Sequence, residues 1–147
     1  MNKIKFRVWD NEDKKVYPVA AISFENEVIF RLYCITGSFE GNPVGKYLKD
    51  KECHIMQSAG LVDKMGTEIY EGDILKIVSE LYTHFGKVAT GKFDTTYKEV
   101  IWYEDSWGYR VLKSKTTTVG FECRGLKVAA KYAEVVGNIY ENPDLIN

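Results

Sequence analysis

The fold of this chain is decided by one stretch, residues 60–74, which reads GLVDKMGTEIYEGDI. Gly66 follows Asp63 at a place where a tight turn needs a positive φ, which glycine adopts without a clash at Cβ. Gly72 and Asp73 form the turn that starts the next strand, and the Asp73 carboxylate can accept backbone N–H groups there. We therefore expect the aspartates of this stretch to bend the backbone rather than to perform chemistry.

Short segments of strand-like sequence lie on both sides of this stretch. Ile4, Phe6 and Val8 alternate with their neighbours in the period-two pattern of a half-buried strand. Pro18 either interrupts the second such segment or places it at a sheet edge. The strands that we expect are residues 4–9, 16–22, 28–35, 53–58, 73–79, 82–91, 100–104, 108–113, 116–123 and 134–140.

The spacing of these strands decides the fold class. Strands that recur about every 8–12 residues are typical of a barrel or a sandwich, so we predict an all-β or β-dominated fold. Residues 108–113 pair with residues 100–104 across a turn at residues 105–108. Leu126 and Ala129 fit helical spacing, but residues 126–133 are too short to distinguish a helix from a strand.

The composition changes between residues 36 and 52, where glycines and a proline stand among charged residues. We expect a long exposed loop here, with one helical turn near Tyr47, and interpret it as a lobe boundary or a mobile flap. The chain then divides into an N-terminal β segment, residues 1–58, and a C-terminal region, residues 59–147. One compact unit is the alternative.

Composition and charge exclude several classes of protein. The chain has 147 residues, of which 45% are hydrophobic and 28% charged, so it is not wholly disordered. A net charge of −1 gives no sign of a nucleic-acid or membrane partner. The three cysteines are scattered, without a C-x-x-C pair, which favours a reducing cytoplasm. We see neither a signal peptide at the N-terminus nor an apolar run of about 20 residues.

The acidic, histidine and cysteine residues form no convincing reactive site. A cation site could use the acidic residues of the 60–74 stretch together with Glu141 and Asp144, but solvated turn acids explain them better. A zinc site would need His54 and His84 to converge with cysteines, and adjacent Cys53 and His54 point to opposite faces of a strand. Neither a nucleophile elbow nor a glycine-rich phosphate loop is present. We expect no catalytic residue, cofactor or metal, and no enzyme. The cysteines and acids considered were Cys34, Cys53, Cys123, Asp63, Glu68, Glu71 and Asp73.

One region combines positive and aromatic residues. Between residues 108 and 132 six positive residues face a single acid, Glu122. Small β-barrels bind single-stranded nucleic acid by stacking its bases on aromatic side chains that lie beside cations. The alternative is that the aromatics are core and the lysines protect sheet edges. The candidate nucleic-acid face comprises Trp107, Tyr109, Arg110, Lys113, Lys115, Arg124, Lys127 and Lys131.

Residues 60–74 also resemble the YopX family of phage and prophage proteins, whose signature reads G-L-x-D-K-x-G-x-E-I-Y-E-G-D-I. Residues 4–10 and 135–145 agree with the ends of that family. The resemblance implies a mostly β protein with a small Src-homology-3-like barrel in its C-terminal part, on which the N-terminal strands pack. It also implies a phage or prophage origin and a bacterial cytoplasm, and it supplies no reaction. The residues of the structural signature are Gly60, Asp63, Gly66, Tyr70, Gly72, Asp73, Asn142 and Pro143. We expect Asn142 and Pro143 to end the last strand, because proline cannot donate to a strand ladder.

The hypothesis that follows is a non-enzymatic protein-interaction module. Tyrosine and tryptophan are enriched at interface anchors, and exposed strand edges offer contact surfaces. We expect a homo-oligomer, with a phage or host protein as a further partner, and no membrane partner. The alternative function is nucleic-acid binding through residues 108–132.

Overall fold

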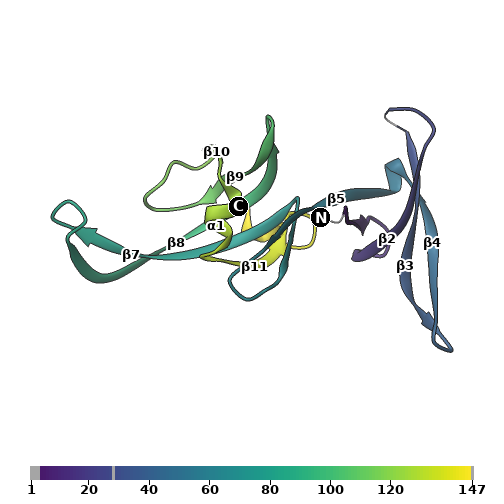
Figure 1. The fold of residues 1–147 in the computed structure, drawn as a ribbon, viewed down its shortest axis with the longest axis horizontal. Helices are drawn as coiled ribbons and strands as arrows, with labels where there is room; N and C mark the ends of the chain where they lie inside the picture. Colours follow the sequence, from purple (N-terminus) through teal and green to yellow (C-terminus); the bar gives the residue numbers. More distant parts are fainter. Residues whose placement is uncertain (1–3, 28, 147) are drawn as a thin grey trace. The chain divides into compact units, whose positions relative to one another are not determined.

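The computed structural model describes residues 4–27 and 29–146, and β-strands dominate this part of the chain (Figure 1). The β-dominated fold class is therefore confirmed, and the Src-homology-3-like barrel stays a prediction. The strands are β1 (Phe6–Asp10), β2 (Lys15–Phe24), β3 (Phe30–Phe39), β4 (Asn42–Lys49), β5 (Cys53–Val62), β6 (Glu68–Tyr70), β7 (Asp73–Thr83), β8 (Val88–Tyr103), β9 (Ser106–Lys113), β10 (Glu122–Arg124) and β11 (Ala133–Asn138). The helices are η1 (Asp50–Glu52), α1 (Leu126–Ala130) and η2 (Pro143–Leu145).

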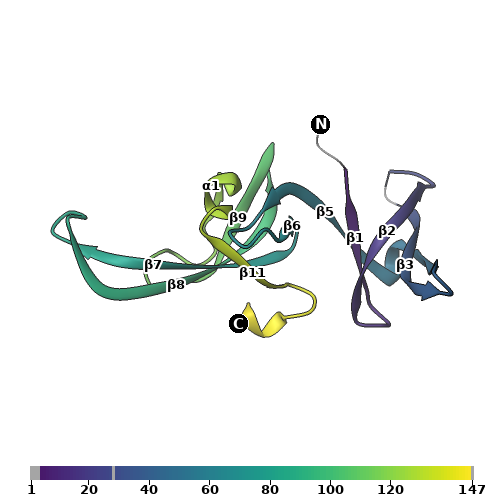
Figure 2. The same ribbon diagram turned by 60° about the horizontal axis from the view of Figure 1, so that its bottom comes forward.

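The strands form two sheets. One has the order β4-β3-β2-β1-β5-β6, and the other has the order β10-β9-β8-β7-β11. The chain divides into two compact units, the first ending at Ser58 and the second beginning at Ala59. Strand β5 runs from the first unit into the second. The long β7–β8 hairpin extends past the other strands of the second unit in both ribbon views (Figure 2).

The first unit has its own apolar core, formed by side chains of β1, β3, β4 and β5. In the first unit, β2 pairs with β1 as far as Pro18 and with β3 from Val19 onward. The proline therefore lies where the strand changes partner, a position that tolerates a missing N–H donor. The predicted interruption is wrong, because β2 continues through Pro18 from Lys15 to Phe24. The predicted edge position is also wrong, because β2 lies between β1 and β3.

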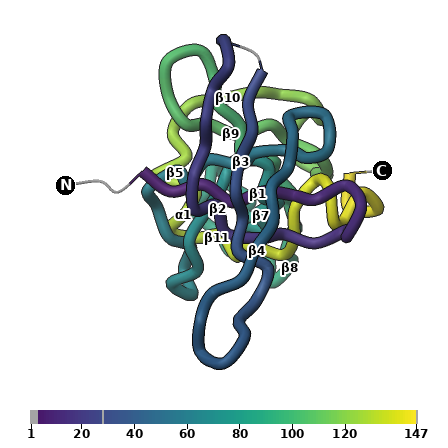
Figure 3. The backbone as a smooth tube through the Cα atoms, turned by 90° about the vertical axis from the view of Figure 1, so that its right-hand side faces the viewer, coloured from purple at the N-terminus to yellow at the C-terminus, as the bar shows by residue number. Residues whose placement is uncertain are grey.

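The loop predicted for residues 36–52 is wrong, because most of that segment is a β-hairpin (Figure 3). Strand β3 continues to Phe39, and Glu40 and Gly41 form the turn, with φ values of 51° and 80°. Two consecutive residues with positive φ match the twist of a two-residue hairpin. Gly45 lies in β4 against the Cys34 carbonyl, where a Cβ would clash. The glycines thus reflect strand packing and a tight turn rather than a loop.

The second unit packs its core between the five-stranded sheet and α1. Leu75 and Val100 of the sheet contact Leu126 and Ala130 of the helix, and all four side chains are buried. Residues 126–130 are helical, which settles the ambiguity left by the sequence. A helix this short gains its stability from packing an apolar face rather than from intrinsic propensity.

Several predicted strands of the second unit have different bounds. The strand predicted for residues 82–91 is instead the turn region of the β7–β8 hairpin, with His84 and Phe85 in the left-handed region. The strand predicted for residues 116–123 is mostly irregular, and only β10 is extended there. The β8–β9 turn lies at residues 104–105, not at residues 105–108. Position 28, where the third strand was predicted to begin, lies outside the described residues.

Candidate functional site

Asp63 fixes the first signature turn. Its carboxylate accepts hydrogen bonds from the backbone N–H groups of Met65 and Thr67, both at 2.8 Å, and of Val135 at 2.9 Å. Burial acts to raise the Asp63 pKa, but these three bonds outweigh it, and the pKa is lowered. Gly66 has a φ of 85°, as expected from the sequence. The carboxylate therefore ties the turn to β11.

The second signature turn is built in the same way. Gly72 has a φ of 84°, and its backbone joins Val100 and Ile139 through hydrogen bonds of 2.9 Å each. The buried Asp73 carboxylate accepts the Tyr70 backbone N–H at 2.8 Å. These contacts agree with the expectation that the aspartates of the signature accept turn N–H groups.

The remaining signature residues have local contacts. Gly60 lies in β5 with a φ of 71°, and the Tyr70 hydroxyl donates to Glu68 at 3.1 Å. Asn142 accepts the Asn138 N–H through its side chain. Pro143 begins η2, several residues after the end of β11, so the Asn-Pro pair starts a helical turn rather than ending the last strand.

The candidate nucleic-acid face does not form one surface. Trp107 packs against the core of the second unit and contacts Trp102 edge-to-face. Arg110 follows Tyr109 in β9, so its side chain lies on the opposite face of the sheet, where it pairs with Glu99 and Glu122. The aromatic and basic residues are therefore divided between core, sheet faces and helix.

The other positive residues of that face differ in their partners. The Arg124 guanidinium contacts Glu104 at 2.6 Å and Asp105 at 3.2 Å, so its charge is compensated. Lys127 and Lys131 are exposed on and just after α1. Lys113 and Lys115 line an open groove beside Phe93.

The Phe93 groove is an open hollow of about 340 Å³. Phe93 is largely exposed there, and Tyr97 and the two lysines 113 and 115 line the same groove. Asp94 is its single acid, and the buried Asp94 carboxylate accepts the Thr116 hydroxyl at 2.8 Å. Two aromatic rings beside two lysines match the composition of a base-stacking surface.

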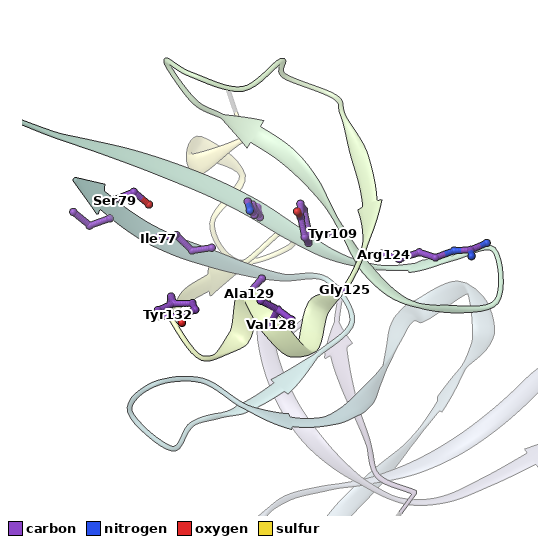
Figure 4. A pocket seen from close by; sticks show the side chains of 10 residues that line it. Ile77, Ser79, Tyr109, Arg124, Gly125, Val128, Ala129 and Tyr132 are labelled. Carbon is purple, nitrogen blue, oxygen red and sulfur yellow. The ribbon is translucent and has the colours of Figure 1, made fainter. Parts of the chain in front are cut away.

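The Lys98 groove, of about 420 Å³, lies between the sheet and α1 (Figure 4). Lys98 and Tyr109 come from β8 and β9, and the Lys98 Nζ lies 3.9 Å from the centroid of the Tyr109 ring. Ile77, Val128 and Ala129 provide apolar walls. Sequence reasoning did not select Lys98, although its alternation with Val100 and Trp102 was a signal that it faces the core side of the sheet.

Burial shifts the pKa values of groups around this groove. It lowers the pKa of Lys98, because the ammonium is partly removed from water. It raises the pKa of Tyr109, and the side-chain hydrogen bond with Cys123 acts in the same direction. Burial also raises the pKa of Glu99, which lies on the opposite face of β8, and of Glu71 in the turn before β7.

The histidines and cysteines do not gather in one place. His84 lies in the β7–β8 turn, whereas His54 of β5 lies opposite Trp9 of β1 in the first unit. Cys34 and Cys53 are buried in the core of the first unit, and burial raises the pKa of both thiols. Within the described ranges, no three His, Cys, Asp or Glu residues form a group that could hold a metal ion.

The end of the β7–β8 hairpin, residues 80–93, is here named the distal hairpin. Four of its large apolar side chains are exposed, and Phe85 at the turn is fully exposed. Phe85 also has a φ of 58°, in the left-handed region that bulky residues avoid. The exposed apolar residues of the distal hairpin are Tyr82, Phe85, Val88 and Phe93.

These features define a β-dominated protein of two units, whose second unit combines two open grooves with an exposed apolar hairpin. The chain belongs to the YopX family: the family model described as YopX protein matches residues 5–147. The resemblance of residues 60–74 to that family is thus confirmed.

A solved structure shares the fold along the whole chain. The crystal structure of protein EF1440 from Enterococcus faecalis matches with a TM-score of 0.56 and 26% sequence identity, covering 100% of both chains. A search of curated proteins gave no match. The α-helix of the described part has five residues, far fewer than the about 20 that a membrane span requires.

Proposed function

We propose that this protein is a non-enzymatic protein-interaction module that self-associates through the distal hairpin, in a phage or prophage programme inside a bacterial cytoplasm. The observation that carries the proposal is Phe85, fully exposed in the left-handed region. Such a conformation costs about 1 kcal/mol for a residue with a side chain. A fully exposed ring makes no packing contact in the monomer to offset that cost, whereas burial against a partner would supply one.

A second copy is the partner that the distal hairpin fits best. Isologous interfaces bring the same patch of two subunits together, and apolar residues dominate their cores. Glu80 lies on β7, while Lys87 and Lys92 lie on or beside β8. A two-fold arrangement of two hairpins can therefore place the acid of each copy near a lysine of the other. The net charge of −1 adds little repulsion between copies.

Light scattering on a sizing column tests this proposal. We expect the wild-type chain to form a dimer or larger assembly whose mass falls toward the monomer on dilution. Phe85→Ser should shift the assembly to monomer at concentrations where the wild type is associated. Val119→Ser is the matched control, because Val119 is also exposed in the second unit but lies outside the distal hairpin. A monomeric wild type, or unchanged association of Phe85→Ser, contradicts the proposal.

Single-stranded nucleic-acid binding is the second candidate, and the Phe93 groove favours it. Phe93 and Tyr97 can stack bases while Lys113 and Lys115 contact phosphates. A titration of labelled oligothymidine at about 50 and about 200 mM salt should show weaker binding at the higher concentration.

The lysines of the groove can be separated from those of the helix. The double variant Lys113→Gln, Lys115→Gln should weaken binding and reduce its salt dependence, because it removes two phosphate contacts. The matched double variant Lys127→Gln, Lys131→Gln should have a smaller effect, since neither lysine lines the Phe93 groove. No binding at the lower salt concentration, or equal losses in both variants, counts against this site.

A further inference from the structure

Lys98 occupies a position that belongs to the core by register. It lies opposite Leu75 of β7 and Val111 of β9, two side chains that are buried. Val100, two residues further along the same face, is also buried. A hydrophobic residue at position 98 would extend this apolar row, so the presence of a lysine there requires an explanation.

No carboxylate pairs with the Lys98 ammonium in the part of the chain that the structure describes, and the titratable group that acts on its charge is the Cys123 thiol. The one contact of the ammonium with a ring is the 3.9 Å approach to Tyr109. The residues that line the Lys98 groove include no carboxylate. Arg124, the other cation at the groove, extends away from the remaining labelled side chains in Figure 4, and its guanidinium pairs with Glu104 and Asp105. One uncompensated positive charge therefore faces the groove.

The rest of the groove is suited to a flat apolar group. Ile77 of the sheet and Val128 and Ala129 of α1 line it, and the Tyr132 side chain stands at its exposed rim. A volume of about 420 Å³ lies within the range of sites for small organic molecules. Such sites combine apolar walls with a few polar groups that orient the ligand, and Lys98 is placed to do this.

We propose that the Lys98 groove is a binding site for a small organic monoanion, an aromatic carboxylate, whose ring lies along the apolar walls and whose carboxylate pairs with Lys98. One free ammonium matches a single negative charge. The pairing strengthens in a partly buried site, since fewer water molecules compete for either charge. This inference goes beyond the proposed self-association, which involves the distal hairpin.

Titration of the full chain with 2-naphthoate, followed by calorimetry and by NMR, tests the site. We expect saturable binding, with the largest amide shifts at Tyr109 and Ala129. Lys98→Met, which keeps an unbranched apolar side chain without the ammonium, should weaken binding about tenfold or more, because a hydrogen bond between two charges is lost. Lys98→Arg should retain most of the affinity, and the neutral analogue 2-naphthylmethanol should bind weakly to all three proteins.

Two controls keep the result interpretable. Lys127→Met removes an exposed lysine of α1 that does not line the groove, and it should leave the affinity unchanged. Phe85→Ser should also bind 2-naphthoate normally, which separates this site from self-association. The amide spectrum of Lys98→Met shows whether that variant is folded. Absence of saturable binding, or equal affinity of wild type, folded Lys98→Met and Lys98→Arg, overturns the proposal.

Discussion

Both units of this protein bury aspartate side chains, but they stabilise the negative charge in different ways. In the first unit, the fully buried Asp10 pairs with Lys46 and also accepts the backbone N–H of Glu12 at 2.9 Å. In the second unit, Asp63 and Asp73 are nearly as buried, and backbone N–H groups are the partners described for their carboxylates. Asp10 is thus stabilised by a side-chain cation in addition to the backbone, whereas Asp63 is stabilised by three backbone N–H groups.

The difference predicts which unit depends on a single side chain. A lysine can be removed by one substitution, and a buried carboxylate left without its cation strongly destabilises a fold. Backbone donors cannot be removed in this way, so the contribution of the Asp63 turn is tested by replacing the aspartate itself. The pKa of Lys46 is raised by its hydrogen bonds to Asp10 and Asp13, whereas the pKa of Asp63 is lowered by backbone bonds despite burial.

The largest effect is expected when Asp63 is replaced. Asp63→Ala should lower the free energy of unfolding of the second unit by about 3–4 kcal/mol, because three backbone N–H groups lose the charged acceptor that ties the turn together and to β11. Urea titration followed by the NMR amide signal of Leu75 measures it. Asp144→Ala is the control, since Asp144 is exposed, and it should change stability by less than about 0.5 kcal/mol. A loss as small as that of the control would show that the turn does not need the carboxylate.

Lys46→Met should have the next largest effect, and it should act on the first unit. We expect the free energy of unfolding, followed at the amide of Val8, to fall by about 2 kcal/mol, because Asp10 stays buried without its cation. The partial exposure of Lys46 keeps the effect below that of a fully buried ion pair. Adding Asp10→Asn to this variant should restore part of the loss, since the buried charge is then gone. Lys15→Met provides the exposed control. If the double variant is less stable than Lys46→Met, the ion pair is not the cause.

Alkaline pH should weaken the first unit through its thiols. Burial raises the pKa of Cys53 from its ordinary 9.0 to about 12. The stabilisation from this thiol is therefore complete below pH 9 and is lost as pH rises toward 12. Lys46, whose pKa is also raised, acts in the same direction at the alkaline end.

A cysteine variant isolates this effect. Between about pH 9 and pH 11, wild-type stability should fall more steeply than that of Cys53→Ala, by up to about 1.4 kcal/mol per pH unit for one proton. Urea titrations under reducing conditions at several pH values measure the two slopes. Parallel curves would rule out Cys53 as the titrating group.

The smallest effect is expected at Lys98 and has the opposite sign. Lys98→Met should raise the stability of the second unit by about 0.5 kcal/mol, because the partly buried ammonium carries a desolvation cost that a thioether lacks. The same titration at Leu75 measures this, with Lys127→Met as the exposed control. A destabilised Lys98→Met would show that the contact with Tyr109 outweighs the cost of burying the charge.

Local sequence patterns predicted the signature turns well. Gly66 bends the chain at its own position, and Asp63 and Asp73 accept N–H groups within four residues of themselves, so this part of the turn chemistry is visible in a sequence. The further bond of Asp63 to Val135 is not visible there. The same approach failed for residues 36–52, because Gly45 is required by its contact with the Cys34 carbonyl on the neighbouring strand. A glycine needed for strand packing and a glycine of a loop look alike in a sequence.

The candidate sites were less predictable than the turns. The count of positive residues between 108 and 132 was correct, but Arg110 and Arg124 are paired with acids outside their own strands. Lys98 was missed because it lies between the predicted strands 82–91 and 100–104, whereas β8 runs from Val88 to Tyr103. Only its register, opposite two buried residues, shows that it belongs to a groove.

The sequence alone determined that this chain is built from β-strands, where two of its turns bend, and to which family it belongs. These properties depend on side-chain alternation and on hydrogen bonds between near neighbours. Tertiary structure decided that Asp10 meets Lys46, that Arg110 pairs with Glu99 and Glu122, and that Lys98 faces a groove. Those outcomes depend on strand register and on packing between distant segments, which are set by the sum of many long-range contacts.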